Sequence, residues 1–342
     1  MKDGENLKGN KVCITEKKDR NGVIMGIGSA LVDILIHEDD DFLKKAGVPK
    51  GGMIYVDNKV IDQVMAEASE KLHIVPGGSA CNTIVGIGQL GGAARFIGKL
   101  GQDDFGKLFE KDLRDNNIEP LFFTSPSPTG RVLSIITPDA QRSMLTYLGA
   151  SSEARAAEIT AECFDGAAIV HIEGYLLYNK DLMMKALELA KDAGVRVSLD
   201  LASFTVVEES KDFLEGIVDD FVDILIANED EARVFTGCSD EAEAIKALAK
   251  KSDIAVLKVG KRGSFIAHAE EIVEVAPKKG RGDEILDTTG AGDLWASGFL
   301  FGLVNGYTLE KCGQLGSMCG YEVCRVVGAN IPAEGWERIK NN

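Results

Sequence analysis

The chain has 342 residues, of which 45% are hydrophobic, and it carries 54 acidic against 38 basic residues, a formal net charge of −16. This length indicates one large domain or two smaller ones. The acidic balance argues against a nucleic-acid partner, which requires a basic face, and against attachment to an anionic membrane surface. No apolar run approaches the roughly 18 residues of a transmembrane helix.

The first 21 residues are polar and rich in lysine, and they lack the hydrophobic core of a signal peptide. We therefore expect a flexible N-terminal extension over residues 1–21. The seven cysteines show no spacing typical of metal ligands or paired disulfides, so they are expected to be core thiols in a reducing compartment. Together these features predict a cytoplasmic protein.

A short apolar run over residues 23–28 ends in glycine and predicts a buried strand. The apolar pattern then continues, with Asp33 as a lone acid inside it. A buried carboxylate needs partners; the hydroxyl groups of a ligand would supply them, and so would an ordinary capped strand end. Further along, Gly77 and Gly78 would let bare backbone approach a ligand, and Asn82 lies one turn into the next predicted helix.

Residues 86–91 match the pattern GxGxxG, which occurs in dinucleotide-binding proteins. The match lies late in a helix-like segment rather than at a strand-to-helix turn, and no suitably placed acid follows it. Close packing of helices by small residues is therefore the preferred interpretation. An NAD-binding oxidoreductase remains as a remote alternative.

Further β structure is expected in two separate clusters. Residues 51–56 predict a short strand after a glycine turn, and residues 132–137 and 143–148 predict a hairpin by their spacing. These clusters, at about 34–56 and 121–148, suggest a small sheet set apart from the main domain.

From residue 160 onward, apolar strands alternate with helical segments, which is typical of βαβ units and a parallel sheet. In such folds ligands bind beyond the carboxyl ends of the strands. Each predicted strand ends in a polar or glycine-rich spot, and we expect these spots to meet at one edge of the sheet. They are Glu173 with Gly174, Asp200, Asn228 with Glu231, and Gly260 with Gly263.

The segment 287–293 reads Asp-Thr-Thr-Gly-Ala-Gly-Asp and leads into an apolar predicted helix. The free amides at the start of a helix, together with the helix dipole, bind anions and phosphate above all. Two acids flank this anion site, Asp287 and Asp293, so a cation or a proton transfer is implied. Our hypothesis is that Asp293 is the base of a phosphoryl transfer, and the alternative is a simple helix cap.

Taken together, these segments resemble the ribokinase/PfkB family of carbohydrate and nucleoside kinases over about residues 23–335. Residues 287–293 are similar to the second family signature, DTxGAGD, and residues 77–106 to the first, while Asn228-x-x-Glu231 matches its NxxE motif. The resemblance implies a ribokinase-like three-layer α/β/α fold with a mainly parallel central sheet. That kinase domain would span residues 22–342, with the elements near 34–56 and 121–148 forming a small β lid.

The resemblance also implies which residues carry the reaction. Asp293 would take the proton from the acceptor hydroxyl, while the amides of Gly290, Ala291 and Gly292 would form an anion hole for the transferred phosphoryl. This fits the chemistry, because phosphoryl transfer depends mainly on positioning and charge stabilisation.

The remaining roles concern ligands, and the implied cofactors are ATP and Mg²⁺, with K⁺ as a further candidate. Asn228 and Glu231 would organise Mg²⁺ mainly through water, although such a pair alone is more often a helix cap. The nucleotide would be bound by Asn228, Lys258, Gly260 and Gly263. The monovalent cation would be bound by Asp287, Thr289, Gly328 and Asn330. The acceptor would be bound by Asp33, Gly77, Gly78, Asn82 and Glu173.

The acceptor itself is expected to be a nucleoside. The phrases at 146–150 and 173–176 look most like bacterial members described as adenosine kinases, and Ser79 stands where sugar-specific members often carry Lys. The expected reaction is ATP-dependent phosphorylation of a primary hydroxyl, from adenosine to AMP, by a monomer or homodimer. The alternatives are a kinase of a free sugar such as ribose or fructose, and a non-catalytic nucleoside sensor, which would have no need of Asp293.

Overall fold

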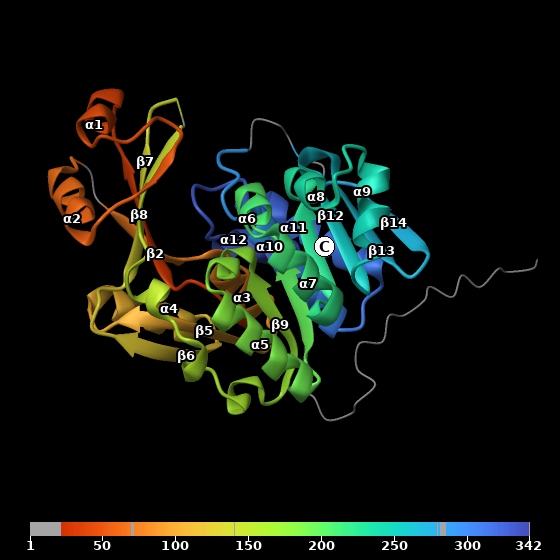
Figure 1. Ribbon diagram of the computed structural model, residues 1–342. Helices are drawn as coiled ribbons and strands as arrows, with labels where there is room; N and C mark the ends of the chain where they lie inside the picture. Colours follow the sequence, from red (N-terminus) through yellow and green to blue (C-terminus); the bar gives the residue numbers. More distant parts are fainter. Residues whose placement is uncertain (1–21, 70–71, 140, 279, 281–284, 342) are drawn as a thin grey trace, which may run out of the picture.

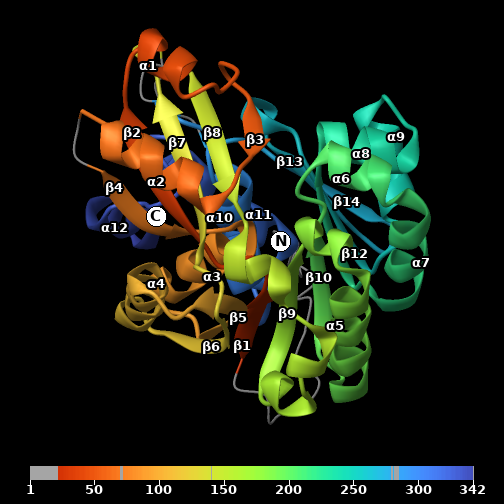
Figure 2. The ribbon, with the colours of Figure 1, turned by 60° about the vertical axis from the view of Figure 1, so that its left-hand side comes forward.

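A computed structural model describes residues 22–69, 72–139, 141–278, 280 and 285–341 of the chain. It contains two β-sheets, a large one at the centre of the molecule and a small one beside it (Figures 1 and 2). The extension predicted for residues 1–21 lies outside the described residues. No helix of the described part is long and apolar enough to span a bilayer.

The large sheet has nine strands in the order β14-β13-β12-β11-β10-β9-β1-β5-β6. The seven strands from β12 to β6 run parallel, and β13 and β14 are antiparallel at one edge. The strands are β1 (Val23–Ile27), β5 (Ala94–Gly101), β6 (Ile118–Ser125), β9 (Ala167–Glu173), β10 (Arg196–Asp200), β11 (Ile224–Asn228), β12 (Ile254–Lys258), β13 (Ser264–His268) and β14 (Glu271–Val275).

Helices cover both faces of this sheet, which explains why its central strands are apolar throughout. Strand β9, for example, is buried at every position. One face packs against α3 (Ser79–Gln89), α4 (Asp104–Asp115), α10 (Ala291–Val304) and α11 (Leu309–Val323). The other packs against α5 (Lys180–Ala193), α6 (Phe204–Glu209), α7 (Lys211–Phe221), α8 (Glu229–Thr236) and α9 (Glu241–Leu248). Helix α12 (Ala333–Lys340) packs in a smaller cluster with α10 and α11. The predicted three-layer α/β/α fold is confirmed.

The small sheet has five strands in the order β3-β8-β7-β2-β4. They are β2 (Leu31–His37), β3 (Met53–Tyr55), β4 (His73–Gly77), β7 (Gly130–Ile136) and β8 (Arg142–Tyr147), with α1 (Asp40–Lys45) and α2 (Asn58–Glu67) packed beside them. A small second sheet was predicted, but its extent differs. Strand β4 belongs to it, and residues 121–125 belong instead to β6 of the large sheet. Strand β4 escaped prediction because it is an edge strand that contains Pro76, which weakens the strand pattern.

The chain passes between the two sheets close to the carboxyl ends of the large sheet. Residues 23–36 looked like one apolar run, yet the structure divides them into β1 of the large sheet and β2 of the small one. The return from β4 leads directly into α3. This arrangement places the small sheet over the edge where ligands bind in parallel α/β folds.

Candidate active site

Asp293 lies in the first turn of α10 and faces the first turn of α3. Its carboxylate accepts hydrogen bonds from Ser79 Oγ at 2.8 Å and from Asn82 Nδ2 at 2.9 Å. The N-cap residue of α10 is Gly290, so the Asp293 side chain does not cap the helix. The Asp293 carboxylate is therefore an acid in the first turn that is bonded to α3 instead of capping α10, and its role as a base stays a prediction.

The start of α10 is shaped by its glycines. Gly290 has a φ of 72°, in the left-handed region, and a Cβ there would lie 2.6 Å from Ala329 Cβ. A Cβ on Gly292 would lie 3.1 Å from Lys258 Nζ. The amide of Ala291 donates to the carbonyl of Thr288 at 3.2 Å. Of the three amides predicted for the anion hole, that of Ala291 is therefore already bonded within the chain, because the turn from Thr288 closes on it. The helix end and the Lys258 ammonium beside it still both favour an anion.

Two carboxyl groups in this region are hard to ionise. Burial raises the pKa of Asp293 to about 6, with Asp200 adding to the effect and Asn82, Ser79 and Lys258 opposing it. Burial likewise raises the pKa of Asp33 to about 6, where Arg142 opposes the shift and Asp293 reinforces it. A carboxyl group with a pKa near 6 is suited to accept a proton close to neutral pH.

The predicted acceptor residues come together around the start of α3. A Cβ on Gly77 would lie 2.5 Å from the Asp33 carboxyl group, so only glycine leaves room for that acid. Gly78 has a φ of 99° and no space for a side chain, because its Cβ would meet the Ser29 carbonyl oxygen at 2.2 Å. Asp33 and the first turn of α3 therefore form one polar surface next to Asp293.

Glu173 ends β9 beside this surface and is 1% exposed. One oxygen accepts from the Ser29 amide at 2.8 Å and the other from the Ala80 amide at 2.9 Å. Burial raises the pKa of this carboxyl group, and the two amide bonds oppose the shift. Since protein amides already engage both oxygens, its predicted contact with the acceptor remains a prediction.

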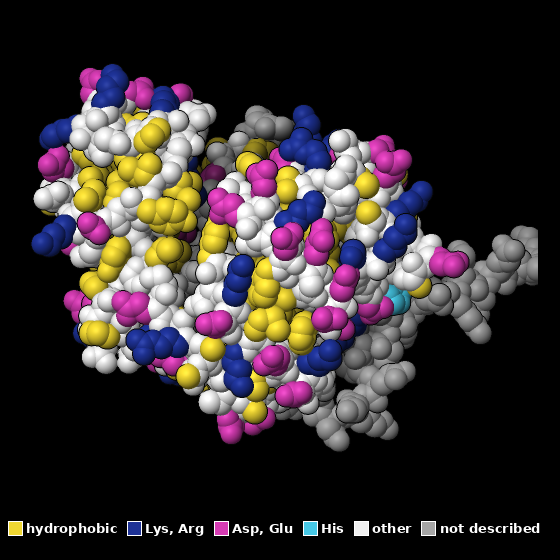
Figure 3. All heavy atoms as spheres, viewed as in Figure 1, with side chains coloured by type: hydrophobic (Ala, Val, Ile, Leu, Met, Phe, Trp, Pro, Cys, Tyr) yellow, Lys and Arg dark blue, Asp and Glu magenta, His cyan; other side chains and the backbone are white. Residues whose placement is uncertain are grey.

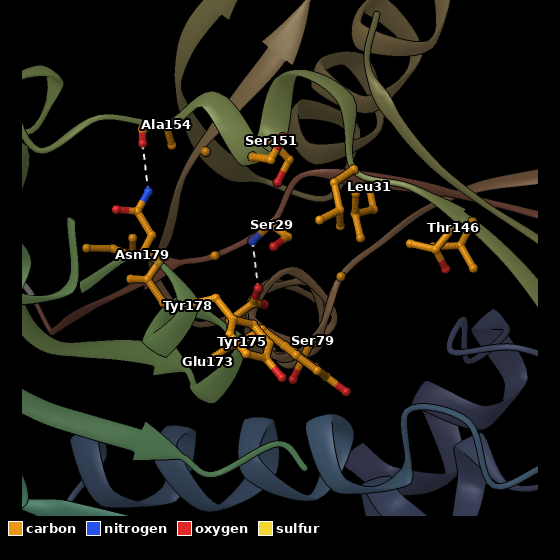
Figure 4. A pocket seen from close by; sticks show the side chains of 18 of the residues that line it. Ser29, Leu31, Ser79, Thr146, Ser151, Ala154, Glu173, Tyr175, Tyr178 and Asn179 are labelled. Carbon is orange, nitrogen blue, oxygen red and sulfur yellow. Dashed lines mark hydrogen bonds between the residues drawn. The ribbon is translucent and has the colours of Figure 1, made fainter. Parts of the chain in front are cut away.

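A cavity of about 520 Å³ opens between the two sheets at this point. Its polar end includes Asp33, Gly78 and Ser79, and the rest of its wall is largely apolar. Figure 4 shows Glu173, Tyr175 and Ser79 close together at the cavity, with Thr146 and Leu31 on another side of it. Hydrophobic side chains also gather on the surface of the small-sheet lobe (Figure 3). The cavity thus offers one reactive end and an extended apolar wall.

The predicted nucleotide residues lie at the ends of neighbouring strands. Lys258 Nζ, at the end of β12, pairs with Asp200 Oδ2 at 2.7 Å, and both side chains are largely buried, 13% and 5% exposed. Burial opposes the charge of Lys258, but Asp200 and Glu231 outweigh it and raise the pKa of the lysine. The charged ammonium of Lys258 therefore lies at the predicted anion site, beside Gly292 at the start of α10 and near Glu231 at the start of α8.

Asn228 and Glu231 form a reciprocal capping box at the start of α8. Asn228 Oδ1 accepts from the Glu231 amide at 2.9 Å, and Glu231 Oε2 accepts from the Asn228 amide at 2.8 Å. This is the helix-cap arrangement that the sequence left open. Burial and Asp200 raise the pKa of Glu231, while Lys258 opposes the shift.

The sequence predicts that Asn228 and Glu231 hold Mg²⁺ mainly through water rather than in a protein cage. Within the described ranges there is no cluster of three or more His, Cys, Asp or Glu able to hold a metal ion. Mg²⁺ usually keeps several waters and is held by one or two carboxylates together with substrate phosphates. Both oxygens of Glu231 accept from Asn228, from its amide and from its side chain, and Glu231 is buried, so the predicted contact of this pair with Mg²⁺ stays a prediction.

The two glycines after β12 differ in their surroundings. Gly263 has a φ of 106°, and a Cβ would lie 2.1 Å from the Val275 carbonyl oxygen, so the turn into β13 already requires glycine there. Gly260 also has a positive φ, of 53°, but no neighbouring atom lies within 4 Å of its Cβ position. Gly260 is therefore the more open of the two to a nucleotide.

The residues predicted to bind a monovalent cation are in part joined by hydrogen bonds. Asp287 accepts from the Thr289 amide and hydroxyl at 2.9 and 2.8 Å and from the Gly328 amide at 2.9 Å. Burial opposes ionisation, but these bonds prevail and lower the pKa of Asp287. Asn330 is exposed two residues beyond Gly328. The cation itself remains a prediction.

Arg142 is a site residue that sequence reasoning missed. It extends from β8 of the small sheet, donates to Ser134 Oγ at 2.9 Å and to the Thr289 hydroxyl, and lines the cavity. It brings a positive charge from the small sheet to the segment 287–293. An arginine in a predicted hairpin carries no signal for this, because the contact joins residues 147 positions apart.

The GxGxxG match over residues 86–91 is explained by packing. Gly86 lies inside α3, where its Cβ would meet Ser297 Oγ of α10 at 2.4 Å, and a Cβ on Gly88 would meet the Asn116 carbonyl oxygen at 2.6 Å. These glycines allow close contact between elements, as the preferred interpretation held.

Comparisons with known proteins agree with this site. Residues 53–336 match the family described as "pfkB family carbohydrate kinase". The structure resembles that of adenosine kinase from Sinorhizobium meliloti, with 30% identity, a TM-score of 0.83 and coverage of 93% of this chain and 98% of the other. It also resembles a probable sugar kinase protein from Rhizobium etli CFN 42, with 30% identity, a TM-score of 0.84 and coverage of 94% and 98%.

A curated relative, the ATP-dependent 6-phosphofructokinase of Thermoanaerobacterium thermosaccharolyticum, is 25% identical over 273 residues, which cover 78% of this chain and 84% of that protein. Kinases of this family use ATP with Mg²⁺. The family match spans most of the chain, and the signature residues meet at one site. The chain belongs to the PfkB carbohydrate kinase family and is a phosphotransferase with an alcohol group as acceptor.

Proposed function

We propose that this kinase transfers the γ-phosphoryl group of ATP to the primary hydroxyl of a nucleoside, with adenosine as the acceptor and AMP as the product. The observation that carries the proposal is the cavity whose polar end, lined by Asp33 and Ser79, is joined to an extended apolar wall; Asp293 lies next to this end, where it accepts from Ser79 Oγ. A free sugar presents hydroxyl groups on every side, whereas a nucleoside has a polar ribose and a flat base that suits apolar walls. The related S. meliloti structure is named an adenosine kinase.

In the proposed reaction the acceptor ribose lies at the polar end of the cavity. Asp33 and Asn82 would bind its hydroxyl groups, and Asp293 would take the proton as the hydroxyl oxygen attacks. The amides of Gly290 and Gly292 would bind the oxygens of the transferred group. Mg²⁺, held through water near Asn228 and Glu231, would neutralise charge on the phosphates.

The role of Asp293 as base predicts a specific pH dependence. A base works only in its deprotonated form, and the pKa of Asp293 is raised to about 6. The value of kcat/KM should therefore fall as the pH drops through about 6 and be level above it. Ser79→Ala removes a hydrogen bond that stabilises the charged form, so this decline should move to higher pH.

A matched control is Thr83→Val. The Thr83 hydroxyl donates to main-chain carbonyls, including that of Asp293 at 3.1 Å, and not to the Asp293 carboxylate, so its loss should leave the position of the decline unchanged. A decline at the same pH in the wild type and in Ser79→Ala would argue against Asp293 as the titrating base.

The acceptor is tested directly by ATP consumption against a panel of nucleosides and sugars, with and without K⁺. We expect kcat/KM for adenosine to exceed that for ribose and fructose by at least about tenfold. If ribose or fructose is the better acceptor, the enzyme is a sugar kinase and the nucleoside proposal fails. The K⁺ arm tests the predicted cation at Asp287 independently.

Thr146 predicts a further feature of acceptor recognition. Its side chain is 4% exposed and lines the cavity, and in the described part of the chain its hydroxyl has no hydrogen-bond partner. The hydroxyl oxygen is itself buried, so a ligand would bond to it only after the side chain turns toward the cavity, and the hydroxyl would then gain a partner. Thr146→Val, which keeps the shape, should lower kcat/KM for adenosine by about tenfold, whereas Thr146→Ser should retain most of it.

Adenosine analogues that lack single ring nitrogens identify the atom involved. The analogue that lacks the bonded nitrogen should be phosphorylated equally well by the wild type and by Thr146→Val. Equal kcat/KM for adenosine in these two proteins would show that the hydroxyl takes no part in recognition.

A further inference from the structure

The chain crosses between the two sheets twice within a small region. The first crossing, residues 28–30, leads from β1 of the large sheet to β2 of the small one. The second, residues 77–80, runs from the last residue of β4 in the small sheet through Gly78 into the first turn of α3. The two crossings touch, because a Cβ on Gly78 would lie 2.2 Å from the Ser29 carbonyl oxygen. The acceptor end of the cavity is built directly on these two segments.

One side chain is bonded to both crossings. Glu173 stands at the end of β9 in the large sheet, and its two oxygens accept from the amide of Ser29 in the first crossing and the amide of Ala80 in the second. Figure 4 shows the bond to Ser29 and the place of Glu173 at the cavity. The direction of a main-chain N–H group is set by the backbone that carries it. These two bonds therefore fix the backbone of both crossings relative to the large sheet.

The surroundings of Glu173 are built for this arrangement. A Cβ on Gly28 would lie 2.5 Å from Glu173 Oε2. There is therefore no room for a side chain at Gly28, where the first crossing lies against the carboxylate. The carboxylate is 1% exposed. Burial of such a group is costly unless its oxygens are bonded, and here the two amides provide the bonds.

The groups held by these crossings are those that the proposed function assigns to the acceptor and to its base. Asp33 follows the first crossing on β2, next to Gly77. Ser79 belongs to the second crossing, and Asn82 follows within the same turn of α3; both donate to Asp293. A shift of either crossing would therefore move the acceptor groups relative to the base. Displacements of about 1 Å at such positions are enough to lower rates by about 100-fold.

We propose that Glu173 is a positioning residue that clasps the two crossings together and to the large sheet, and thereby sets the acceptor groups against Asp293. This role differs from direct contact with the acceptor, because it operates in the free protein. It goes beyond the proposed function and holds for a nucleoside or a sugar acceptor alike.

Hydrogen exchange of the acceptor-free protein tests the clasp. In Glu173→Gln the side-chain NH₂ group must face one of the two amides, so at least one bond is lost. We expect the amides of Ser29 or Ala80 to exchange about tenfold faster or more, with the centre of the large sheet unchanged. Unchanged exchange at both amides would overturn the proposal, even if the KM for the acceptor rose.

A matched control is Glu322→Gln. Glu322 is also buried, at 6% exposure, but it pairs with Arg325 and Arg338, away from the two crossings. Its substitution should leave the exchange of Ser29 and Ala80 at the wild-type rate. Faster exchange at these amides in Glu322→Gln as well would mean a general loosening and would also overturn the clasp.

A second variant covers the case in which Glu173→Gln does not fold. Gly28→Ala keeps the carboxylate but places a methyl group against it, so it should also speed exchange at Ser29 and Ala80. In either variant we expect kcat with the acceptor to fall by at least about tenfold, while the Kd for an ATP analogue stays within about twofold of the wild type. Wild-type exchange at both amides in Gly28→Ala would contradict the proposal.

Discussion

Replacing Asp293 with Asn should lower kcat by about 10²–10⁴-fold, the range typical of a lost general base, while the affinity for ATP changes little. The amide is nearly the same shape as the carboxylate and can still accept from Ser79 Oγ, so the contact between α10 and α3 is kept. What is lost is the capacity to take the proton from the acceptor hydroxyl. Stopped-time assays of phosphoryl transfer, combined with direct measurement of ATP binding, separate these two effects.

Stability provides a second measurement of the same variant. The pKa of Asp293 is raised mainly by burial, with Asp200 adding to the effect, so its negative charge is unfavourable in the folded protein. The neutral Asp293→Asn variant should therefore melt at the same temperature as the wild type or higher. A control is Asp223→Asn, which changes a carboxylate bonded to the Val197 amide at the opposite end of the strands and should leave kcat unaffected. Turnover near the wild-type value in Asp293→Asn would end the base hypothesis.

The sequence predicted the layered fold because its signals there are local. The apolar runs of β9 to β12 and the helices between them specify a parallel sheet, and the polar residues after each strand must then meet at one edge. The segment 287–293 was recognisable because glycines and acids at fixed spacing have a chemical meaning of their own. The structure brings Asp293 together with Asn82, 211 positions earlier in the chain, as that interpretation requires.

The features that were missed depend on contacts between distant segments. Asp200 was seen only as a polar strand end, and nothing in the sequence indicates that its carboxylate pairs with Lys258. Arg142 lies in a hairpin whose position over the site is set by the packing of the small sheet. The unpaired hydroxyl of Thr146 has meaning only once the cavity around it is known.

A similar limit applies to Glu173. The sequence placed an acid at the end of a buried strand, close to the acceptor residues, and the structure has it there. Its two amide partners belong to segments 144 and 93 positions away, and they could not be foreseen from spacing. The distinction between binding a ligand and holding the backbone that binds it therefore rests on hydrogen-bond partners that only the folded chain supplies.

Replacing Lys258 with Met should lower kcat by about 10²–10³-fold, comparable to the loss of one donor at an oxyanion site. The ammonium lies beside the start of α10, 3.1 Å from the position of a Cβ on Gly292, so it adds a full positive charge to the amides there. Charge builds on the transferred phosphoryl group in the transition state, and this cation would stabilise it. The affinity for ATP should weaken more than the affinity for ADP, because only ATP carries the γ-phosphoryl group.

Two variants show whether this effect is specific. Lys261→Met removes an exposed lysine from the turn that follows β12, and it should leave kcat near the wild-type value. Lys258→Arg retains the positive charge and the pairing with Asp200. It therefore avoids the loss of folding that an unpaired buried carboxylate can cause. It should also keep more activity than Lys258→Met. Suppose that Lys258→Met folds, keeps the wild-type kcat and keeps the wild-type ratio of ATP affinity to ADP affinity. The ammonium then serves only to neutralise Asp200 and Glu231. The expected loss of the ATP preference would instead place Lys258 at the γ-phosphoryl group, because the pair with Asp200 alone cannot distinguish the two nucleotides.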